Sequence, residues 1–288
     1  MSRVIQQSSR FAAVTGAGSG LGRDIALGLA AKGYRVFGTA ITPEEINDLQ
    51  QAAGGAVTLT SCDITDEPAV KRWARAVSAQ SDGGLNLLIS NAGILTPGPI
   101  ETSPLDSIRR EFEVNVVGAL SVVNAFLPAL RKARGRIVQV STWTAHLPLP
   151  FNGPSGASKA AMEVFATVYR EELKRFGIDV VVAVAGNMRT GGPAKTASAL
   201  ARTAERMTLQ ELDLYGKAFG IFAAKLNSMQ DNGLASIDAA KRVIEIAEQN
   251  PAPRFAAVGQ DAEEILRVVR EKSDDGQDAL RFQIVGLK

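Results

Sequence analysis

Residues 10–22, RFAAVTGAGSGLG, decide the fold. A short apolar run leads into a glycine-rich turn, and a helical pattern begins directly after it, which predicts a strand, a turn and a helix. Glycine allows the tight turn and the close backbone approach that let a helix amino terminus face a pyrophosphate. The spacing is G-x-x-x-G-x-G at Gly16, Gly20 and Gly22, and Leu21 stands where the commoner G-x-G-x-x-G pattern needs glycine. Such a turn can also be a simple strand-to-helix connection, so a dinucleotide site needs support from the rest of the chain.

The remainder of the chain repeats the alternation of strand and helix. Six apolar runs separated by amphipathic segments favour an α/β fold in which a doubly wound parallel sheet is covered on both faces, a three-layer, Rossmann-type single domain over residues 1–288. Near-continuous apolarity, as in VVVAVA, is typical of a strand buried on both sides. The runs are RFAAVTG (10–16), GYRVFGTA (33–40), AVTLTSCD (56–63), LNLLISNAG (85–93), GRIVQVST (135–142) and IDVVVAVAG (178–186).

Residues 194–232 interrupt this rhythm because they are helical in composition and carry no strand. We predict a helical insertion over the carboxyl edge of the sheet, where ligands bind in such folds. A helix at 237–249 follows, and residues 259–288 form a carboxyl-terminal extension. The insertion has an apolar set of side chains that a substrate lid could present to a hydrophobic molecule: Leu200, Met207, Leu209, Leu212, Leu214, Phe219, Ile221 and Phe222.

Composition excludes several classes of partner. The chain has 288 residues with 45% hydrophobic content. It has 32 basic and 30 acidic residues, so we expect no positively charged surface that would bind nucleic acid or an anionic membrane. The one cysteine, Cys62, excludes an internal disulfide and a cysteine-rich metal cluster. The first residues lack the apolar core of a signal peptide, and polar residues interrupt the apolar segment 114–130, which we interpret as a buried helix. These features favour a cytoplasmic protein.

Several motifs, in order from about residue 10 to residue 190, resemble the short-chain dehydrogenase/reductase family. The glycine turn TGAGSGLG resembles the family's cofactor loop, CDITD (62–66) its adenine-contacting segment, and NAG (91–93) the signature after its fourth strand. FEVNVVGAL contains the helix asparagine, GRIVQVST leads to the family's catalytic serine position, and SGASKAA resembles its active-site helix. AGNMRT (185–190) resembles the turn whose threonine holds the nicotinamide amide. Farther on, PRFAAVGQDAEE resembles the carboxyl-terminal segment of members related to hydroxysteroid and retinol dehydrogenases.

The resemblance implies a nicotinamide dinucleotide cofactor. In the family an acidic residue at the end of the second strand selects NAD, whereas an arginine nearby accepts the phosphate of NADP. Neither is present at Ala40 and Ile41, so the cofactor is NADP or NAD, and we lean to NADP because no carboxylate repels the phosphate there. The implied cofactor-binding residues are Gly16, Ser19, Gly20, Leu21, Gly22, Ile41, Asp63, Ile64, Asn91, Ala92, Gly93, Lys159 and Thr190.

The catalytic residues that the resemblance implies are only partly retained. Asn115 and Lys159 match, and Thr142 stands in the position of the serine that orients the substrate oxygen, with Ser141 as an alternative. The position of the proton-transferring tyrosine is occupied by Ser155. An aliphatic hydroxyl is a much weaker acid than a phenol, and loss of a general acid commonly costs about 10²- to 10⁴-fold in rate.

Other groups are candidates for the missing acid. His146, the only histidine, lies in the loop between Thr142 and Ser155, although a loop histidine is more often simply exposed. Tyr215 could fold over the site, whereas Tyr169 is about 15 Å beyond Lys159 on the same predicted helix. Ser155 and Lys159 at i and i+4 also permit a Ser-Lys nucleophile, a weak alternative because ribose binding already explains the lysine.

Two classes of function follow from these residues. The first is an NAD(P)-dependent oxidoreductase that transfers a hydride between the cofactor and an alcohol or ketone on a small, largely apolar substrate. The second is a dinucleotide-binding protein with little or no turnover, in a sensor or interaction role, because Ser155 replaces the tyrosine. The resemblance also implies a homodimer or homotetramer. No metal site is expected.

Overall fold

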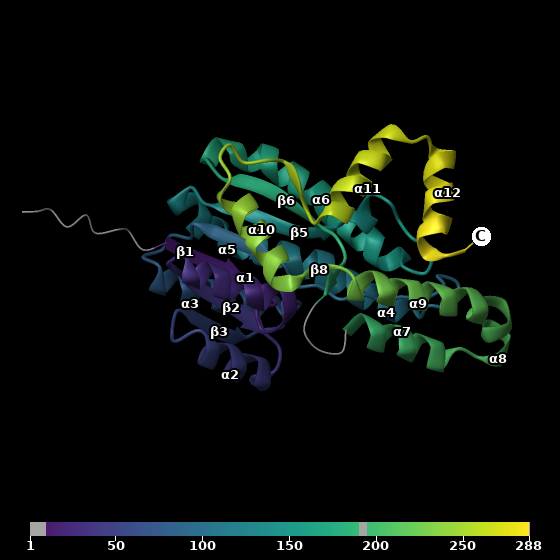
Figure 1. Cartoon of the computed structure of the whole chain (residues 1–288). Coiled ribbons are helices and arrows are strands. Elements are labelled where there is room, and N and C mark those ends of the chain that lie inside the picture. Colours follow the sequence, from purple (N-terminus) through teal and green to yellow (C-terminus); the bar gives the residue numbers. More distant parts are fainter. Residues whose placement is uncertain (1–9, 190–194, 288) are drawn as a thin grey trace, which may run out of the picture.

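All six predicted runs form strands of one parallel sheet in the computed structural model, which describes residues 10–189 and 195–287 (Figure 1). The α/β, doubly wound fold is therefore confirmed. A seventh strand, β9 (Phe255–Val258), pairs in parallel with β6 (Asp179–Ala185) at the edge and was not predicted. In sheet order the strands are β3 (Val57–Ser61), β2 (Tyr34–Ala40), β1 (Arg10–Val14), β4 (Leu87–Ser90), β5 (Arg136–Thr142), β6 (Asp179–Ala185) and β9 (Phe255–Val258).

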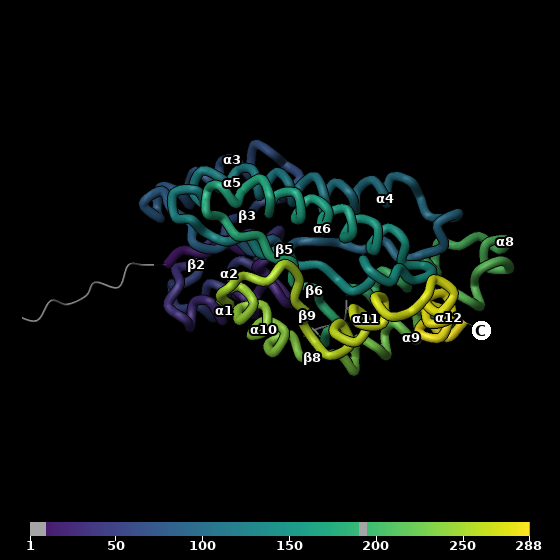
Figure 2. Tube along the Cα trace, turned by 90° about the horizontal axis from the view of Figure 1, so that it is seen from above, coloured from purple at the N-terminus to yellow at the C-terminus, as the bar shows by residue number. Residues whose placement is uncertain are grey.

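Helices cover both faces of the sheet, as Figure 2 shows from above. One apolar core lies under α1 and α10, with Ile25 and Val243 fully buried, and a second lies under α3, α5 and α6, with Trp73 packed edge-on against Phe126. Strand β6 is buried along its length except at Asp179, as its unbroken apolar pattern predicts. The helices of the two layers are α1 (Gly20–Ala31), α2 (Pro43–Ala52), α3 (Glu67–Gln80), α4 (Leu105–Phe112), α5 (Ala119–Ala133), α6 (Gly153–Leu173) and α10 (Ser236–Glu248).

Helices α4 and α5 are joined by a π-helical turn, Glu113–Gly118, into one long helix, Leu105–Ala133. By length and composition this helix could cross a membrane, but 56% of its most apolar window is buried inside the fold. The apolar segment 114–130 is thus largely core, with Val122, Phe126 and Leu130 almost inaccessible to solvent.

The insertion and the carboxyl-terminal helices lie beyond the carboxyl ends of the strands (Figure 1). Two contacts place the insertion there: Lys195 Nζ donates to Ser19 Oγ at 3.0 Å, and Thr203 Oγ1 donates to the Pro97 carbonyl at 2.8 Å. Two short strands, β7 (Met188–Arg189) and β8 (Leu234–Ala235), pair in parallel on either side of the insertion in the sequence. This pair was not predicted. The helices are α7 (Lys195–Arg206), α8 (Leu209–Glu211), α9 (Lys217–Asp231), α11 (Gln260–Glu271) and α12 (Asp274–Val285).

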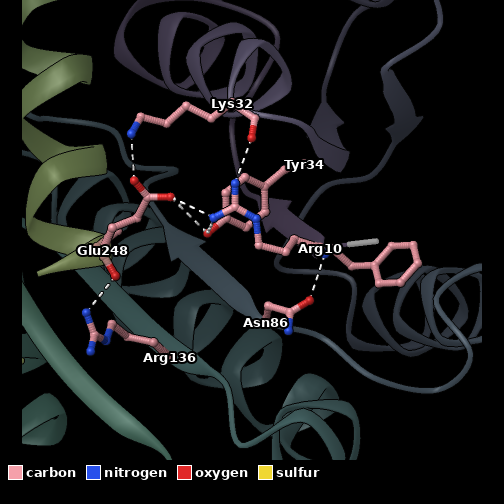
Figure 3. Close-up of polar contacts among 8 residues, drawn as sticks. Arg10, Lys32, Tyr34, Asn86, Arg136 and Glu248 are labelled. Carbon is pink, nitrogen blue, oxygen red and sulfur yellow. Dashed lines mark hydrogen bonds and ion pairs between the residues drawn. The ribbon is translucent and has the colours of Figure 1, made fainter. Parts of the chain in front are cut away.

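A polar cluster fastens α10 to the amino-terminal ends of β1 and β2 (Figure 3). The carboxylate of Glu248 accepts from Lys32 Nζ at 2.7 Å, from Arg10 Nη1 at 3.0 Å and from the Tyr34 hydroxyl at 3.3 Å. Partial burial raises the pKa of Glu248, but the hydrogen bond and charge of Lys32, with the Tyr34 bond and the Arg10 charge, outweigh it and lower the pKa. We assign this cluster to stability, because it lies at the opposite end of β1 from the glycine-rich turn.

Candidate functional site

The glycine-rich turn and the loop after β4 form one unit joined by Thr15. Its hydroxyl oxygen accepts from the backbone N–H groups of Asn91 and Ala92, at 2.9 and 3.0 Å, and the Asn91 side chain donates to the Thr15 carbonyl at 3.0 Å. Because β1 and β4 are neighbours in the sheet, the loops that follow them emerge side by side. The sequence therefore brings TGAGSGLG and NAG together.

The packing at Gly22 shows why this turn excludes side chains. A Cβ atom there would lie 2.2 Å from the Gly16 carbonyl oxygen and 2.6 Å from Asn91 Nδ2. Gly16 also has a left-handed backbone, with φ of +63°, which disfavours any other residue. A close backbone turn at the start of α1 fits a pyrophosphate, so the residues present suit a dinucleotide.

Asp63, the predicted adenine-contacting residue, is fixed by its neighbours. One carboxylate oxygen accepts from the backbone and hydroxyl of Thr65, at 2.9 and 2.8 Å, and the other accepts from Arg110 Nη2 at 2.8 Å. Desolvation raises the pKa of Asp63, but the Thr65 and Arg110 hydrogen bonds outweigh it and lower the pKa. Arg110 was not predicted from the sequence. The next residue, Ile64, is buried against Gly118.

Asn115 lies in the π-helical turn, and its amide is fully used. The side-chain oxygen accepts from the Ile94 backbone N–H, and the side-chain nitrogen donates to the Ile94 carbonyl, both at 2.9 Å. The same nitrogen donates to Ser158 Oγ at 3.0 Å and to Glu111 Oε1 at 3.3 Å. π-helical turns inside α-helices occur frequently at functional sites, and this one connects the loop after β4 to α6.

Lys159 projects from α6 toward the end of β5. Its ammonium group donates to the Val140 carbonyl at 3.2 Å, and the residue is partly buried. A Cβ atom on Gly93 would lie 3.3 Å from Lys159 Nζ and 3.1 Å from Asn115 Oδ1, so these three residues meet at one point. Burial lowers the pKa of Lys159, and the charges of Glu111 and Glu163 oppose this shift without reversing it.

Ser155 and Thr142 lie on α6 and β5, the two elements that Lys159 joins through its bond to Val140. Ser155 lies in the first turn of α6, one helical turn before Lys159, and its carbonyl accepts from Ser158 Oγ at 3.1 Å. Thr142 is the last residue of β5, and its hydroxyl oxygen accepts from the Thr144 backbone N–H at 3.4 Å. Both are only partly buried. Their positions agree with the predicted roles, which stay predictions.

Two buried glutamates near Lys159 were missed by the sequence reasoning. Glu163 lies one turn beyond Lys159, where its carboxylate accepts a short hydrogen bond from the Ser141 hydroxyl and lies 3.0 Å from His146 Nε2. His146 also packs edge-on against Phe255 of β9, with the ring centroids 5.9 Å apart. The Ser141 hydroxyl is thus held by Glu163, and His146 lies beside the same carboxylate between β5, β9 and α6, so the histidine is not a freely exposed loop residue.

Glu111 is the second buried glutamate. It lies one turn before Asn115, and its Oε1 is also 3.5 Å from Ser158 Oγ. Desolvation raises the pKa of Glu111 to about 7, against the lowering effects of Thr96, Lys159 and Ser158. The sequence feature that could have identified Glu111 as a site residue was its i, i+4 spacing to Asn115. That spacing alone does not show that the side chain points inward.

No tyrosine takes over the place of the missing phenol. The chain has three, and each is engaged elsewhere. Tyr34 belongs to the Glu248 cluster, Tyr169 donates to Asn124 Oδ1 at 2.7 Å, and Tyr215 donates a short hydrogen bond to Glu101. Thr190, predicted to hold the nicotinamide amide, lies outside the described residues.

We expected no carboxylate at the end of β2, but the structure places one there. Glu45, in the first turn of α2, turns back so that its Oε2 accepts from the Ile41 backbone N–H at 3.3 Å. A Cβ atom on Gly18 would lie 2.8 Å from the same oxygen, which places this carboxylate against the glycine-rich turn. Helix α2 thus brings a carboxylate close to the end of a strand that has none of its own.

Comparisons with known proteins agree with this geometry. The family model described as short chain dehydrogenase matches residues 10–201. Retinol dehydrogenase 5 of Homo sapiens is 35% identical over 185 residues, which cover 64% of this chain and 58% of that protein, so the match spans under two thirds of the relative. A short-chain dehydrogenase structure from Streptomyces avermitilis superposes with a TM-score of 0.78 at 25% identity, covering 98% of both chains. One from Burkholderia cenocepacia, solved in complex with NADP, gives 0.71 at 25% identity, with coverage of 97% of this chain and 99% of that one.

Proposed function

The chain belongs to the short-chain dehydrogenase family, and we propose that it is an NAD(P)-dependent oxidoreductase acting on an alcohol or ketone of a small, largely apolar molecule. The observation that carries this proposal is the convergence of Asn115, Lys159 and Gly93 at the carboxyl ends of β4 and β5. A protein that only bound adenine would need neither Lys159 nor the asparagine that fixes the adjoining loop.

We propose that three groups of the described residues bind the pyrophosphate, the adenine and the ribose of the dinucleotide. The backbone of the glycine-rich turn and the start of α1 would bind the pyrophosphate, and Asp63 would accept a hydrogen bond from adenine. Lys159 would donate to ribose hydroxyls beside the nicotinamide. When bound, the nicotinamide supplies or accepts the hydride. The Burkholderia structure binds NADP, and we propose that this chain binds the same class of nicotinamide dinucleotide.

We propose that the substrate oxygen is held by the Thr142 hydroxyl and that its proton is exchanged through Ser155. Ser155 and Lys159 are four residues apart on α6 and so share one helix face. Burial lowers the pKa of Lys159, which makes its ammonium group a better proton donor than a solvated lysine. Proton transfer through a serine is slower than through a phenol, so the account predicts a slow enzyme.

The proposed substrate class rests on the insertion. A cavity of about 230 Å³ lies between α7 and α9 and has a mainly apolar lining that includes Leu200, Met207 and Phe219. Phe219 and Phe222 also pack against Phe151, four residues before Ser155, with ring centroids 5.7 and 5.5 Å from that of Phe151. Apolar side chains are thus in contact with one another from the insertion to the start of α6, the helix that carries Ser155 and Lys159. A hydrophobic alcohol or ketone suits such a surface.

The second candidate function is dinucleotide binding with little turnover. It is favoured by one observation, that Ser155 replaces the tyrosine and that all three tyrosines have partners elsewhere. Turnover by the serine form separates the two candidates, because cofactor binding is common to both.

The test compares the wild-type chain with Ser155→Tyr. Cofactor binding is followed by NADH and NADPH fluorescence, and turnover by cofactor consumption over a panel of apolar alcohols and ketones. We expect both proteins to bind cofactor, and we expect the tyrosine form to turn over about 10²- to 10⁴-fold faster than a slow but measurable wild type. If only the tyrosine form turns over, the binding role replaces the enzymatic one. If neither protein binds a cofactor, both candidate functions fail.

A further inference from the structure

The turn that follows β6 is fixed by contacts from distant parts of the chain. The Gly186 N–H donates to the Val258 carbonyl of β9 at 2.9 Å. The Asn187 carbonyl accepts from the Leu234 N–H of β8 at 3.0 Å. Asp261 holds the same turn, because its Oδ2 accepts from the Asn187 backbone N–H at 2.7 Å and from the Asn187 side-chain Nδ2 at 3.0 Å. A Cβ atom on Gly186 would collide with the Asp261 carboxylate, so this carboxylate packs directly against the glycine.

Asp261 also has an ordinary role at the start of α11. It lies in the first turn of that helix, where the helix dipole favours an acidic side chain. Glu263 lies in the same turn with an exposed side chain and can meet that need as well. The dipole requires no bond to a residue 74 positions earlier, and Asp261 makes two such bonds. The carboxyl-terminal extension therefore holds the turn after β6 through one side chain.

The sheet order places this turn at the reacting end of the proposed cofactor site. Asp63, after β3, is the proposed adenine contact, the glycine-rich turn follows β1, and the order continues through β4 and β5 to β6. A dinucleotide lying along this edge with its adenine over β3 therefore extends its nicotinamide toward β5 and β6. Thr142, the last residue of β5, pairs with Ala185, the residue directly before the turn. The turn thus lies beside the residue that we propose holds the substrate oxygen.

We propose that Asp261 is a positioning residue for the nicotinamide end of the cofactor, and that it acts by holding the turn after β6 in the shape that the bound ring contacts. This inference rests on the proposed dinucleotide-binding function. A turn that is already fixed loses little conformational freedom when a ligand binds, so it binds more tightly than a loose turn. A hydrogen bond to a charged group corresponds to about 10- to 100-fold in an equilibrium constant. The adenine and pyrophosphate contacts lie at the ends of β3 and β1, on the far side of β4 and β5 from this turn.

The experiment compares ligands that differ only at the nicotinamide. Calorimetric titration measures the dissociation constants of NADH and ADP-ribose, and of the 2′-phosphorylated pair NADPH and 2′-phospho-ADP-ribose, for the wild type and each variant. Asp261→Ala removes both bonds to Asn187, whereas Asp261→Asn keeps an oxygen that can accept both. Glu263→Gln is the control for charge in the same helical turn. Thermal unfolding checks the fold, and Asn187→Ala, which removes one bond and keeps Asp261, tests the inference if Asp261→Ala does not fold.

We expect Asp261→Ala to weaken binding of the preferred dinucleotide by about tenfold or more, and to change binding of the matching ADP-ribose by less than about twofold. Asn187→Ala should weaken the dinucleotide alone by about threefold or more, and Asp261→Asn should stay within about threefold of the wild type. Glu263→Gln should bind both ligands as the wild type does. If Asp261 is merely structural, Asp261→Ala weakens both ligands alike or neither, and either result would overturn the inference while the proposed function stands. If the wild type binds none of the four ligands, the proposed function fails and the inference fails with it.

Discussion

Lys159 lies near two buried acidic side chains, and this sets the charge balance of the site. Glu163 is held by Ser141 and His146, whereas Glu111 is linked to Asn115 and Ser158. Burial disfavours the charged form of each group, and their mutual attraction offsets only part of that cost. The pKa of Lys159 is lowered and that of Glu111 is raised, so both shifts favour the neutral forms.

The raised pKa of Glu111 predicts a stability that falls as pH rises. Between its usual value of 4.5 and about 7 the folded protein holds a proton that the unfolded chain has released, so each increase in pH favours unfolding. The full cost above pH 7 is about 3 kcal/mol, at 1.36 kcal/mol for each pH unit. Glu111→Gln should remove this slope and gain about 3 kcal/mol at pH 8 but little at pH 4, as urea unfolding at both pH values would show.

Glu113→Gln is the control for this prediction, because Glu113 lies two residues farther along the same helix with an exposed side chain. It should keep the wild-type slope. A difference between Glu111→Gln and wild type that is the same at both pH values would contradict the assignment.

At the residue scale the sequence predicted the positions that belong to ordered motifs. Thr142 ends a strand, Ser155 and Lys159 lie in the first two turns of the helix that follows, and Asn115 lies within a long helix. The hydrophobic pattern already shows the order of these elements. Glu45 and Glu163 could not be predicted, because their roles depend on which way a helical side chain points and on what a neighbouring strand places beside it.

The first turn of α1 carries the clearest prediction at the scale of elements. Gly22→Ala would push a methyl group against the Gly16 carbonyl and Asn91 Nδ2, where the backbone cannot give way. We expect a loss of about 1–3 kcal/mol of stability and at least about a hundredfold weaker NADH binding, because the pyrophosphate loop is displaced. Calorimetry and fluorescence titration measure the two effects.

Gly220→Ala provides the matched control, since Gly220 is also inside a helix and a Cβ atom there meets nothing within 4 Å. It should stabilise α9 by up to about 1 kcal/mol and leave cofactor affinity unchanged. Normal cofactor binding by Gly22→Ala would show that the turn is not a pyrophosphate site.

Strands buried in the sheet were predictable from their patterns, even the four-residue β4, whereas partly exposed or two-residue strands were not. The six predicted strands are apolar through most of their length, but β9 has four residues, of which only Val258 is buried, and β7 and β8 have two residues each. Their pairing is set by neighbours distant in the sequence. The π-helical turn at Asn115 could likewise not be predicted, because its residues have the hydrophobic pattern of an ordinary α-helix.

At the scale of the whole molecule, the outer face of α6 is apolar and exposed. Val164, Phe165 and Val168 are 64%, 41% and 46% exposed, and Val117 in the adjacent π-helical turn is 51% exposed. An exposed strip of this kind is typical of a protein interface. We propose that two copies of the chain pair through it, in agreement with the homo-oligomer that the sequence resemblance implies.

Val168→Glu tests this pairing, because a charge in the centre of an apolar interface cannot find a partner. Sedimentation at micromolar concentration should show a dimer or tetramer for the wild type and a monomer for the variant. Ile237→Glu, at a similarly exposed residue of α10 on the other face of the sheet, should leave the oligomer intact. A monomeric wild type would contradict the proposal.

The fold class and the insertion were predictable at this scale because they depend on the order of apolar runs and on a long segment without strands. The packing of α7 and α9 near the site was not, since it depends on contacts such as that between Lys195 and Ser19, 176 residues apart.

The most direct test of the central claim, that this chain moves a hydride despite Ser155, is isotope transfer. NADH and NADPH carrying deuterium at the transferable position are incubated with apolar ketones, and the product alcohols are analysed by mass spectrometry. The account predicts deuterium on the carbinol carbon with the wild-type chain, more with Ser155→Tyr, and little or none with Lys159→Met. Cofactor binding without any label in a product from the wild type, while Ser155→Tyr transfers it, would contradict the claim and identify the chain as a dinucleotide-binding protein.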